Sequence, residues 1–152
     1  MKPSLYFPLF VDLSEKKIVI IGAGKIAGRR AQVLSEFAEH ITVIAPDISP
    51  DIQLLADTGK LKVIQKIYED ADIDEADIVL AATNDEILNQ EIAEHCRKKH
   101  IIVNNCSDRS QCDFYFPGVI HTDDIVIGVT ANGKNHIKVK KVTEQIKKVL
   151  NQ

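Results

Sequence analysis

The sequence predicts an α/β fold in which a doubly wound parallel sheet precedes a small hairpin and a final helix. Short apolar runs rich in β-branched residues alternate with amphipathic segments of helical period between residues 17 and 103, and the first run ends in glycine. After residue 113 this alternation gives way to two adjacent strand patterns joined by a tight turn. We therefore expect one domain over residues 1–113 and a second region over residues 114–152.

The first strand is expected at residues 17–21, because an unbroken β-branched run is typical of a strand buried on both faces. A helix is expected over residues 25–39, with Arg29 and Arg30 among its outward-facing residues. The other elements of this domain follow in order: strand 41–45, helix 52–58, strand 61–64, strand 78–82, helix 85–99 and strand 101–103. The spacing in helix 85–99 places these apolar residues inward: Ile87, Leu88, Ile92, Ala93 and Cys96.

The second region carries strand patterns at residues 118–121 and 125–130, with Asp123–Asp124 as the turn between them. Two adjacent strands with so short a connection are antiparallel, so a hairpin is expected. A final helix is expected over residues 137–150, with an apolar stripe along one side. Together with the hairpin, that stripe predicts dimerisation of the chain as a symmetric homodimer.

The composition limits the classes of function. A net charge of −3 and a pI near 5.9 argue against nucleic-acid binding, which needs an excess of Lys and Arg on one surface. No apolar stretch reaches the ~18–20 residues of a membrane span. Because Cys96, Cys106 and Cys112 have neither disulfide nor zinc spacing, we expect a cytoplasmic protein with reduced thiols and no metal site.

Residues 22–28 form the turn between the first strand and its helix, and they contain the pattern Gly-x-Gly-x-x-Ala. Gly22 permits the tight turn, Gly24 lets a pyrophosphate approach the backbone, and Ala27 is small enough for close packing of helix on sheet. In this strand-to-helix context the motif predicts a Rossmann-type domain that binds a nicotinamide dinucleotide.

A ribose-binding acid is expected at the end of the second strand, and there the chain reads Pro46-Asp47. Asp47 either reaches the ribose hydroxyls or caps the next turn. No arginine follows that strand directly, so a 2′-phosphate has no evident partner and NAD is favoured over NADP.

Polar residues follow the next two strands, at the edge where open α/β sheets bind ligands. Thr83 and Asn84 either line the nicotinamide or its ribose, or belong to a helix cap. After the last strand, Asp108 either acts as a general base, with its pKa moved toward working pH by partial desolvation, or lies in a solvated loop paired with Arg109. His121, beside the hairpin, is a weaker candidate for acid–base work.

The order of these motifs resembles the siroheme synthase family, and within it the branch with precorrin-2 dehydrogenase activity. The resemblance covers nearly the whole chain and rests on these segments: 7–13, 19–30, 42–46, 81–84, 103–104 and 113–117. It implies NAD-dependent oxidation of precorrin-2 to sirohydrochlorin, with the tetrapyrrole bound between a Rossmann domain and a dimerisation region. Many relatives continue into a C-terminal helical domain, so this chain looks like a short form.

The resemblance also assigns residues. Lys25, Ile26, Pro46 and Asp47 match cofactor-contacting positions. The essential aspartate of many relatives corresponds to Ser107, and Asp108 inherits the role of base by adjacency. The expected substrate ligands are Asn104, Arg109, Lys134 and Lys138, whose polar and cationic groups suit a substrate with eight carboxylates.

Two other functions remain open at this stage. The chain can be a module that binds NAD without turnover, as a redox sensor or partner subunit. Relatives with two activities also insert ferrous iron, but no metal-active residues are evident in this sequence, so ferrochelatase activity is the less expected addition.

Overall fold

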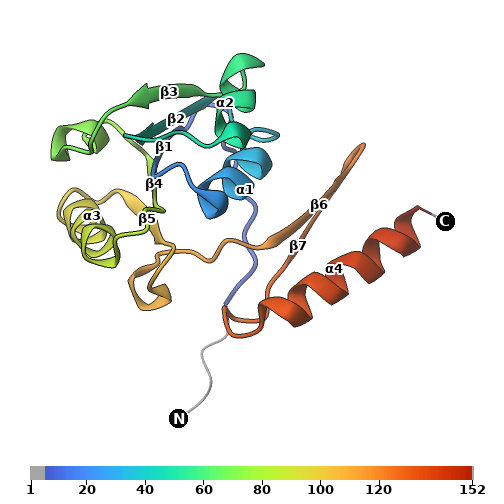
Figure 1. The fold of residues 1–152 in the computed structure, drawn as a ribbon. Coiled ribbons are helices and arrows are strands. Elements are labelled where there is room, and N and C mark those ends of the chain that lie inside the picture. The colour runs from blue at the N-terminus through green and yellow to red at the C-terminus, as the bar shows by residue number, and fades with distance from the viewer. Residues whose placement is uncertain (1–5, 152) are drawn as a thin grey trace, which may run out of the picture. The chain divides into compact units, whose positions relative to one another are not determined.

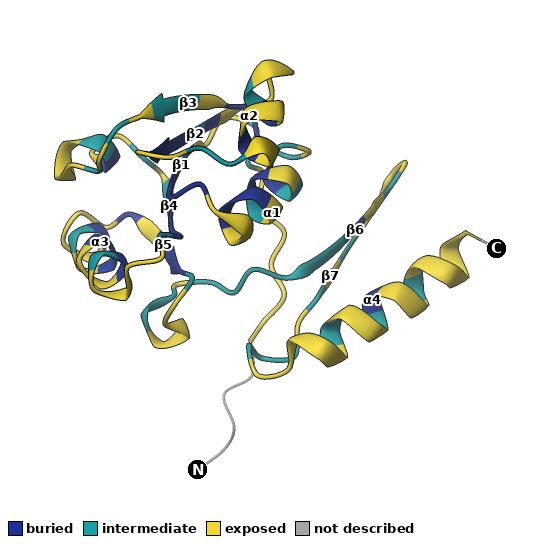
Figure 2. Ribbon diagram, in the orientation of Figure 1, coloured by how far each residue is buried: buried dark blue, intermediate teal, exposed yellow. Residues whose placement is uncertain are grey.

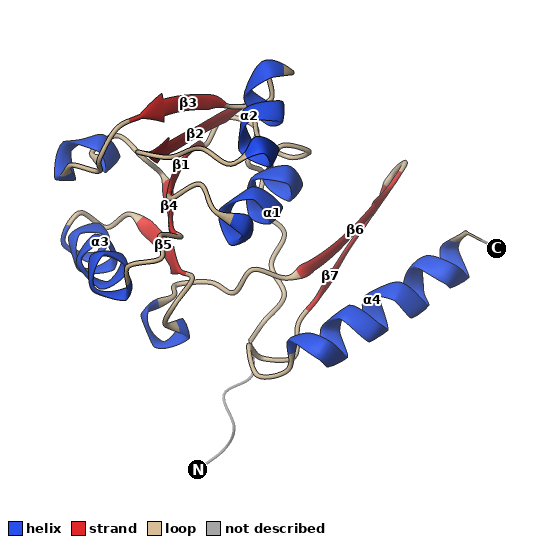
Figure 3. Ribbon diagram, in the orientation of Figure 1, coloured by secondary structure: helices blue, strands red, loops and turns tan. Residues whose placement is uncertain are grey.

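A computed structural model describes residues 6–151, and these form two compact units (Figure 3). The first unit spans residues 11–114, and the second combines residues 6–10 with residues 115–151. Residues 6–10 join the second unit through Tyr6, whose hydroxyl donates to that of Tyr115 at 2.8 Å, with the ring centroids 4.2 Å apart. This attachment joins segments 109 residues apart, which no local pattern predicts.

The first unit contains a five-stranded parallel sheet with strand order β3-β2-β1-β4-β5 (Figure 1). Its strands are β1 (Lys17–Ile21), β2 (His40–Ala45), β3 (Lys62–Gln65), β4 (Ile78–Ala81) and β5 (Ile102–Asn105). Its helices are α1 (Lys25–Leu34), α2 (Pro50–Asp57) and α3 (Glu86–Lys98), with short 3₁₀ turns η1 (Asp70–Ile73) and η2 (Arg109–Gln111). The strand order reverses between β1 and β4, which confirms the doubly wound fold.

The core of the first unit lies on both faces of this sheet. Figure 1 shows α1 and α2 on one side and α3 on the other, as right-handed crossovers in opposite directions require. Val19 and Ile21 of β1 pack in one cluster with Ile92 of α3. Ile18 and Ile20, which alternate with them, are also at most 1% exposed, so β1 is covered on both faces (Figure 2).

Two helix predictions are wrong in detail. Helix α1 ends at Leu34 and not at residue 39, because Ser35 turns the chain and its hydroxyl donates to the Gln32 carbonyl at 2.7 Å. Ile87, expected to face inward, is 72% exposed in the first turn of α3. The buried side chain nearby is instead Asn89.

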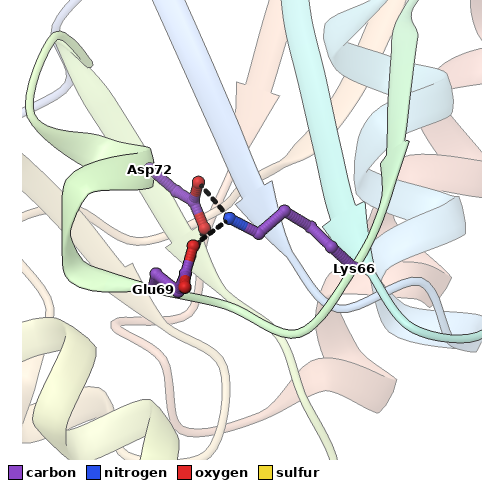
Figure 4. Close-up of polar contacts among 3 residues, drawn as sticks. All are labelled: Lys66, Glu69 and Asp72. Carbon is purple, nitrogen blue, oxygen red and sulfur yellow. Dashed lines mark hydrogen bonds and ion pairs between the residues drawn. The ribbon is translucent and has the colours of Figure 1, made fainter.

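The turn η1 was not predicted, and Lys66 organises it. Its ammonium nitrogen lies 2.5 Å from a carboxylate oxygen of Glu69 and 2.9 Å from one of Asp72 (Figure 4). These carboxylates hold the pKa of Lys66 above its usual value. Glu69 and Asp72 also form a capping box on η1, so the acidic stretch after β3 is an ordered turn.

The chain returns along the outer edge of β5 after η2. The Val103 amide donates to a carboxylate oxygen of Asp113, and the Asp113 amide donates to the Val103 carbonyl, both at 2.9 Å. The Asn105 amide donates to Sγ of Cys112 at 3.2 Å, and that thiol donates to the Asn105 carbonyl. Strand β5 therefore extends two residues beyond its predicted end.

In the second unit, β6 (Gly118–Thr122) and β7 (Ile125–Val129) form an antiparallel hairpin, followed by α4 (His136–Leu150). This confirms the hairpin and the final helix. Helix α4 packs closely on β6, because a Cβ added at Gly118 would lie 2.8 Å from the hydroxyl of Thr143. Ile137 and Val149 of α4 are 83% and 67% exposed within the chain.

Gly22, directly after β1, packs against the backbone at the end of β4, where the strand order reverses. Its φ is +107°, and an added Cβ would lie 2.6 Å from the carbonyl carbon of Ala82 and closer still to its oxygen. The glycine is needed both for its backbone conformation and for this approach.

Replacing Gly22 by alanine is expected to destabilise the chain by about 2–5 kcal/mol, because left-handed strain and a backbone clash add together. Gly59→Ala is the matched control: Gly59 also has positive φ (+74°), but no atom lies within 4 Å of its added Cβ. It should cost only about 1–2 kcal/mol of strain. Urea denaturation measures both, and equal losses would show that the contact with Ala82 carries no cost.

Candidate functional site

The candidate site lies at the carboxyl ends of the parallel strands, where backbone hydrogen bonds hold successive loops together. The Ala82 amide donates to the Ile21 carbonyl at 2.8 Å, and the Cys106 amide donates to the Ala81 carbonyl at 2.9 Å. The Ser49 amide reaches the carbonyl of Ala23 in the glycine turn at 3.3 Å. The loops after β1, β2, β4 and β5 thus meet at the switch point of the sheet, where such folds bind ligands.

Gly24 is the N-cap of α1, a position where glycine is common, but neither its φ nor a packing contact requires a glycine there. Its φ of −83° is open to any residue, and no atom lies within 4 Å of an added Cβ. No side chain caps the helix, and its first turn contains no acid. The uncapped amides and the helix dipole favour an anionic group. This open cradle, which a Cβ would fill, fits the pyrophosphate of a dinucleotide.

The neighbouring turn residues suit a bound cofactor. Lys25 and Ile26 are exposed, Ile26 to 50%, whereas Ala27 is fully buried against the sheet. An exposed isoleucine beside uncapped amides offers an apolar surface next to an anion site. Ala27 is the packing position of the motif.

The loop after β2 presents Pro46 and Asp47, both exposed. The Pro46 carbonyl accepts a hydrogen bond from the Gln65 side chain at 2.8 Å, which ties the loop to β3. The N-cap of α2 is Ser49, so Asp47 is not that cap. The contact of Asp47 with a ribose stays a prediction.

After β4, the residue that caps the helix is Asp85. Thr83 and Asn84 do not cap it, so a contact between them and a ligand stays a prediction. A carboxylate oxygen of Asp85 accepts from the amides of Ile87 and Leu88 at 3.0 and 3.2 Å. Asn84 is exposed and Thr83 is half-buried at the same edge. Thr83 and Asn84 are therefore held in place by a capped helix that begins directly after them.

Asn89 is a site residue that the sequence analysis missed. It is fully buried, and its side-chain amide bonds to Thr83 on one side and to Ser107 on the other. The sequence does carry a signal for it, because Asn89 lies at helical spacing from the inward residues Ile92, Ala93 and Cys96.

Of the two interpretations of Asp108, the structure does not show the desolvation that the first requires. The residue is exposed, and one carboxylate oxygen accepts from the hydroxyl and the amide of Ser110 at 2.7 and 2.9 Å. These hydrogen bonds lower the pKa of Asp108 below its usual 3.8. The solvated-loop interpretation is correct to this extent, and Asp108 is a carboxylate at neutral pH.

Asn105 holds the loop that carries Ser107 and Asp108. It is 3% exposed, and its side-chain oxygen accepts from the amide and hydroxyl of Ser107 at 2.9 and 2.8 Å and from the Asp108 amide at 3.3 Å. Its side-chain nitrogen donates to Gln111 at 3.0 Å. The predicted acid–base residues thus have a fixed backbone.

Arg30 was expected to face outward, but its guanidinium reaches the end of β5. One nitrogen donates to the side-chain oxygen of Asn104 and lies 2.8 Å from Sγ of Cys106. The amide nitrogen of Asn104 donates to the Phe114 carbonyl at 2.8 Å. Burial raises the pKa of the Cys106 thiol, and the charge of Arg30 opposes this. Asn104 therefore already has partners at both ends of its side-chain amide, and its substrate contact stays a prediction.

Of the three remaining predicted residues, one lies in the first unit and two lie in the second. Arg109 is exposed at the start of η2, in the first unit. His121, on β6, and Lys134, after the turn of Asn132 and Gly133, are exposed residues of the second unit.

Within residues 6–151, no group of three or more His, Cys, Asp or Glu side chains is placed to hold a metal ion. No helix in the same part of the chain is both long and apolar enough to cross a membrane.

The chain is similar to known proteins over most of its length. The chain is 39% identical over 144 residues to "Probable multifunctional siroheme biosynthesis protein HemA" of Ruminiclostridium josui, covering 94% of this chain and 28% of that protein. It is 32% identical to the siroheme synthase of Baumannia cicadellinicola subsp. Homalodisca coagulata, covering 95% of this chain and 31% of the relative. The chain therefore spans about a third or less of the length of these curated relatives.

A solved structure shares the fold. "SirC, precorrin-2 dehydrogenase" superposes with a TM-score of 0.82 at 23% identity, over 94% of this chain and 70% of that one. Residues 9–118 match the family described as "Putative NAD(P)-binding", and this range contains the glycine turn and all the loops of the candidate site. The chain belongs to this NAD(P)-binding family.

Proposed function

We propose that this chain binds NAD and oxidises precorrin-2 to sirohydrochlorin, a step of siroheme biosynthesis. The observation that carries the proposal is the uncapped helix start at Gly24, placed at the switch point beside a hydrogen-bonded group of polar loops. The names of the relatives, siroheme synthase and precorrin-2 dehydrogenase, support the choice of substrate.

In this proposal the glycine turn and the loop after β2 hold the cofactor. The amides at the start of α1 receive the pyrophosphate, and Asp47 accepts from the ribose hydroxyls. The other cofactor contacts are proposed for Gly22, Lys25, Ile26, Ala27, Pro46, Thr83 and Asn84. Because an acid follows β2 and no arginine does so directly, NAD is preferred over NADP.

The oxidation removes a hydride and a proton from the tetrapyrrole, and bound NAD⁺ supplies the hydride acceptor. We propose Asp108 as the base that accepts this proton. Ser107, the residue before it, and His121 are the other acid–base candidates. Asn104, Arg109 and Lys134 are the proposed ligands of the substrate carboxylates. Asp108 is ionised at neutral pH and exposed to solvent, so it can release the proton directly to water.

The second candidate is an NAD-binding module without turnover. The lowered pKa of Asp108 favours it, because a general base works best with a pKa near the operating pH. The two candidates share the cofactor site and differ only in whether NADH forms. Insertion of iron into sirohydrochlorin is a separate activity that added ferrous ion tests.

We also propose that the chain forms a homodimer in the cytoplasm. The second unit exposes apolar side chains on β7 and α4, and they support the dimer: Ile125, Val126, Ile137 and Val149. The three free thiols support a reducing compartment.

The cofactor proposal predicts that Gly24→Ala leaves the fold intact and weakens NAD binding. The added Cβ meets no protein atom, so the stability loss should stay under about 1 kcal/mol. It would fill the cradle of the pyrophosphate, so the Kd for NAD should rise at least ~10-fold. Calorimetric titration with NAD and NADP measures both affinities, and unchanged NAD affinity in the variant contradicts the assignment.

The reaction proposal predicts that anaerobic mixing of the protein with precorrin-2 and NAD produces NADH and sirohydrochlorin in equal amounts. Asp108→Ala should lower the rate by about 100-fold or more. Because its pKa is lowered, Asp108 stays ionised from about pH 8 to about pH 6 and should cause no loss of rate in that range.

Asp12→Ala is the matched control for this reaction. Its carboxylate accepts from the hydroxyl and the amide of Ser14 at 2.7 and 3.0 Å, the same arrangement as in Asp108, but it lies outside the proposed site. It should keep the full rate. Tight NAD binding without any NADH would reject the enzyme and leave the binding module.

The dimer proposal predicts a mass of twice 16.9 kDa in light scattering at micromolar concentration. Ile137→Glu on α4 should shift the mass toward the monomer, because it places a charge in the apolar contact. Ile87→Glu is the control, since Ile87 is comparably exposed (72% against 83%) but lies on α3 of the first unit. A monomeric unmodified chain would reject the proposal.

A further inference from the structure

The side chain of Asn89 uses its whole hydrogen-bonding capacity inside the protein. Its nitrogen donates to the Thr83 carbonyl at 3.0 Å and to the Ser107 hydroxyl at 3.1 Å. Its oxygen accepts from the Thr83 amide at 3.0 Å and from the Thr83 hydroxyl at 2.7 Å. Two donors and two acceptor positions are all that an asparagine side chain offers, and here all are filled.

These bonds continue the sheet where its own ladder ends. The Cys106 amide donates to the Ala81 carbonyl, and the segments that follow β4 and β5 then leave the sheet as separate loops. Beyond that point Asn89 bonds to both backbone groups of Thr83, as a neighbouring strand does, and passes the connection on to Ser107. A residue of α3 thus ties together the loops that follow β4 and β5.

The connection extends to the predicted base. Ser107 donates to the side-chain oxygen of Asn105, and the same oxygen accepts from the Asp108 amide. The chain of contacts therefore runs from Thr83 through Asn89, Ser107 and Asn105 to Asp108.

We propose that Asn89 is a positioning residue, which holds the Thr83 loop and the Ser107 loop at a fixed separation for the reaction. This rests on the proposed function, because Thr83 is assigned there to the cofactor and Ser107 to the acid–base group. Small displacements between reacting groups are costly, and a shift of about 1 Å can lower a rate by about 100-fold. Asn89 touches neither reactant and acts through the two loops.

The first test needs no cofactor. In Asn89→Ala, the Thr83 amide loses its acceptor, so its hydrogen exchange measured by NMR should accelerate about 10-fold or more. Asn89→Leu has a similar volume and no acceptor for the Thr83 amide, and it serves if the alanine variant does not fold. Gln90→Ala is the control, because Gln90 is exposed and its side chain donates to Glu94 within the same helix. A Thr83 amide that stays protected in both variants of Asn89 overturns the link.

The second test separates positioning from packing. The kcat for NADH formation should fall about 10–100-fold in Asn89→Ala while the KM for NAD changes by less than about threefold. If Asn89 acts through Ser107, the double variant with Ser107→Ala should lose no more rate than the more impaired single variant.

Independent, multiplicative losses, or a lowered melting temperature with unchanged kcat, would reject the positioning role. If the unmodified chain binds NAD but forms no NADH, the proposed reaction fails. That result is distinct from failure of the Asn89 link, which the exchange measurement decides alone.

Discussion

The close contact between Gly22 and Ala82 is the constraint on which the site depends. It brings the end of β1 against the end of β4 with no side chain between them, where the strand order reverses. The helix start at Gly24 and the polar loop at Thr83 then lie on neighbouring strand ends. A larger residue at Gly22 would separate the cofactor turn from the loops that carry the proposed chemistry. The fold thus uses one glycine for its own assembly, whereas the next, Gly24, has no such contact and is the one proposed to approach the cofactor.

Much of the fold could be predicted from the sequence because its signals are local. The β-branched run at residues 17–21 and the glycines after it define a strand, a turn and a helix within a dozen residues. The contacts that organise the site are not local. Arg30 reaches Asn104 across 74 residues, and Asn89 meets Ser107 across 18. The sequence indicates a solvated Arg30 on an amphipathic helix, and no local pattern shows that Asn89 meets Ser107.

The sequence predicts where the candidate site lies in the fold better than it predicts the burial and the pKa of its residues. The loop of Ser107 and Asp108 lies at the expected edge, and the solvated-loop interpretation of Asp108 fits, because the residue is exposed and Ser110 donates to its carboxylate. No pattern in the sequence distinguishes a capping aspartate from a buried base, since both follow a strand and precede a turn. Fixed geometry, supplied by Asn89 and Asn105, is what this site offers a reaction in place of a strongly shifted pKa.

The return of the chain along β5 also affects how copies of the protein meet. An open edge strand offers unpaired amides and carbonyls, and such edges recruit strands from other molecules into aggregates. At Val103 and Asn105 these outward groups are already bonded to Asp113 and Cys112. The edge is closed by the molecule's own chain. Edge-to-edge growth of the sheet past β5 is thereby blocked, and a contact between copies at this edge has to use side-chain surfaces, where its stoichiometry can be limited by shape.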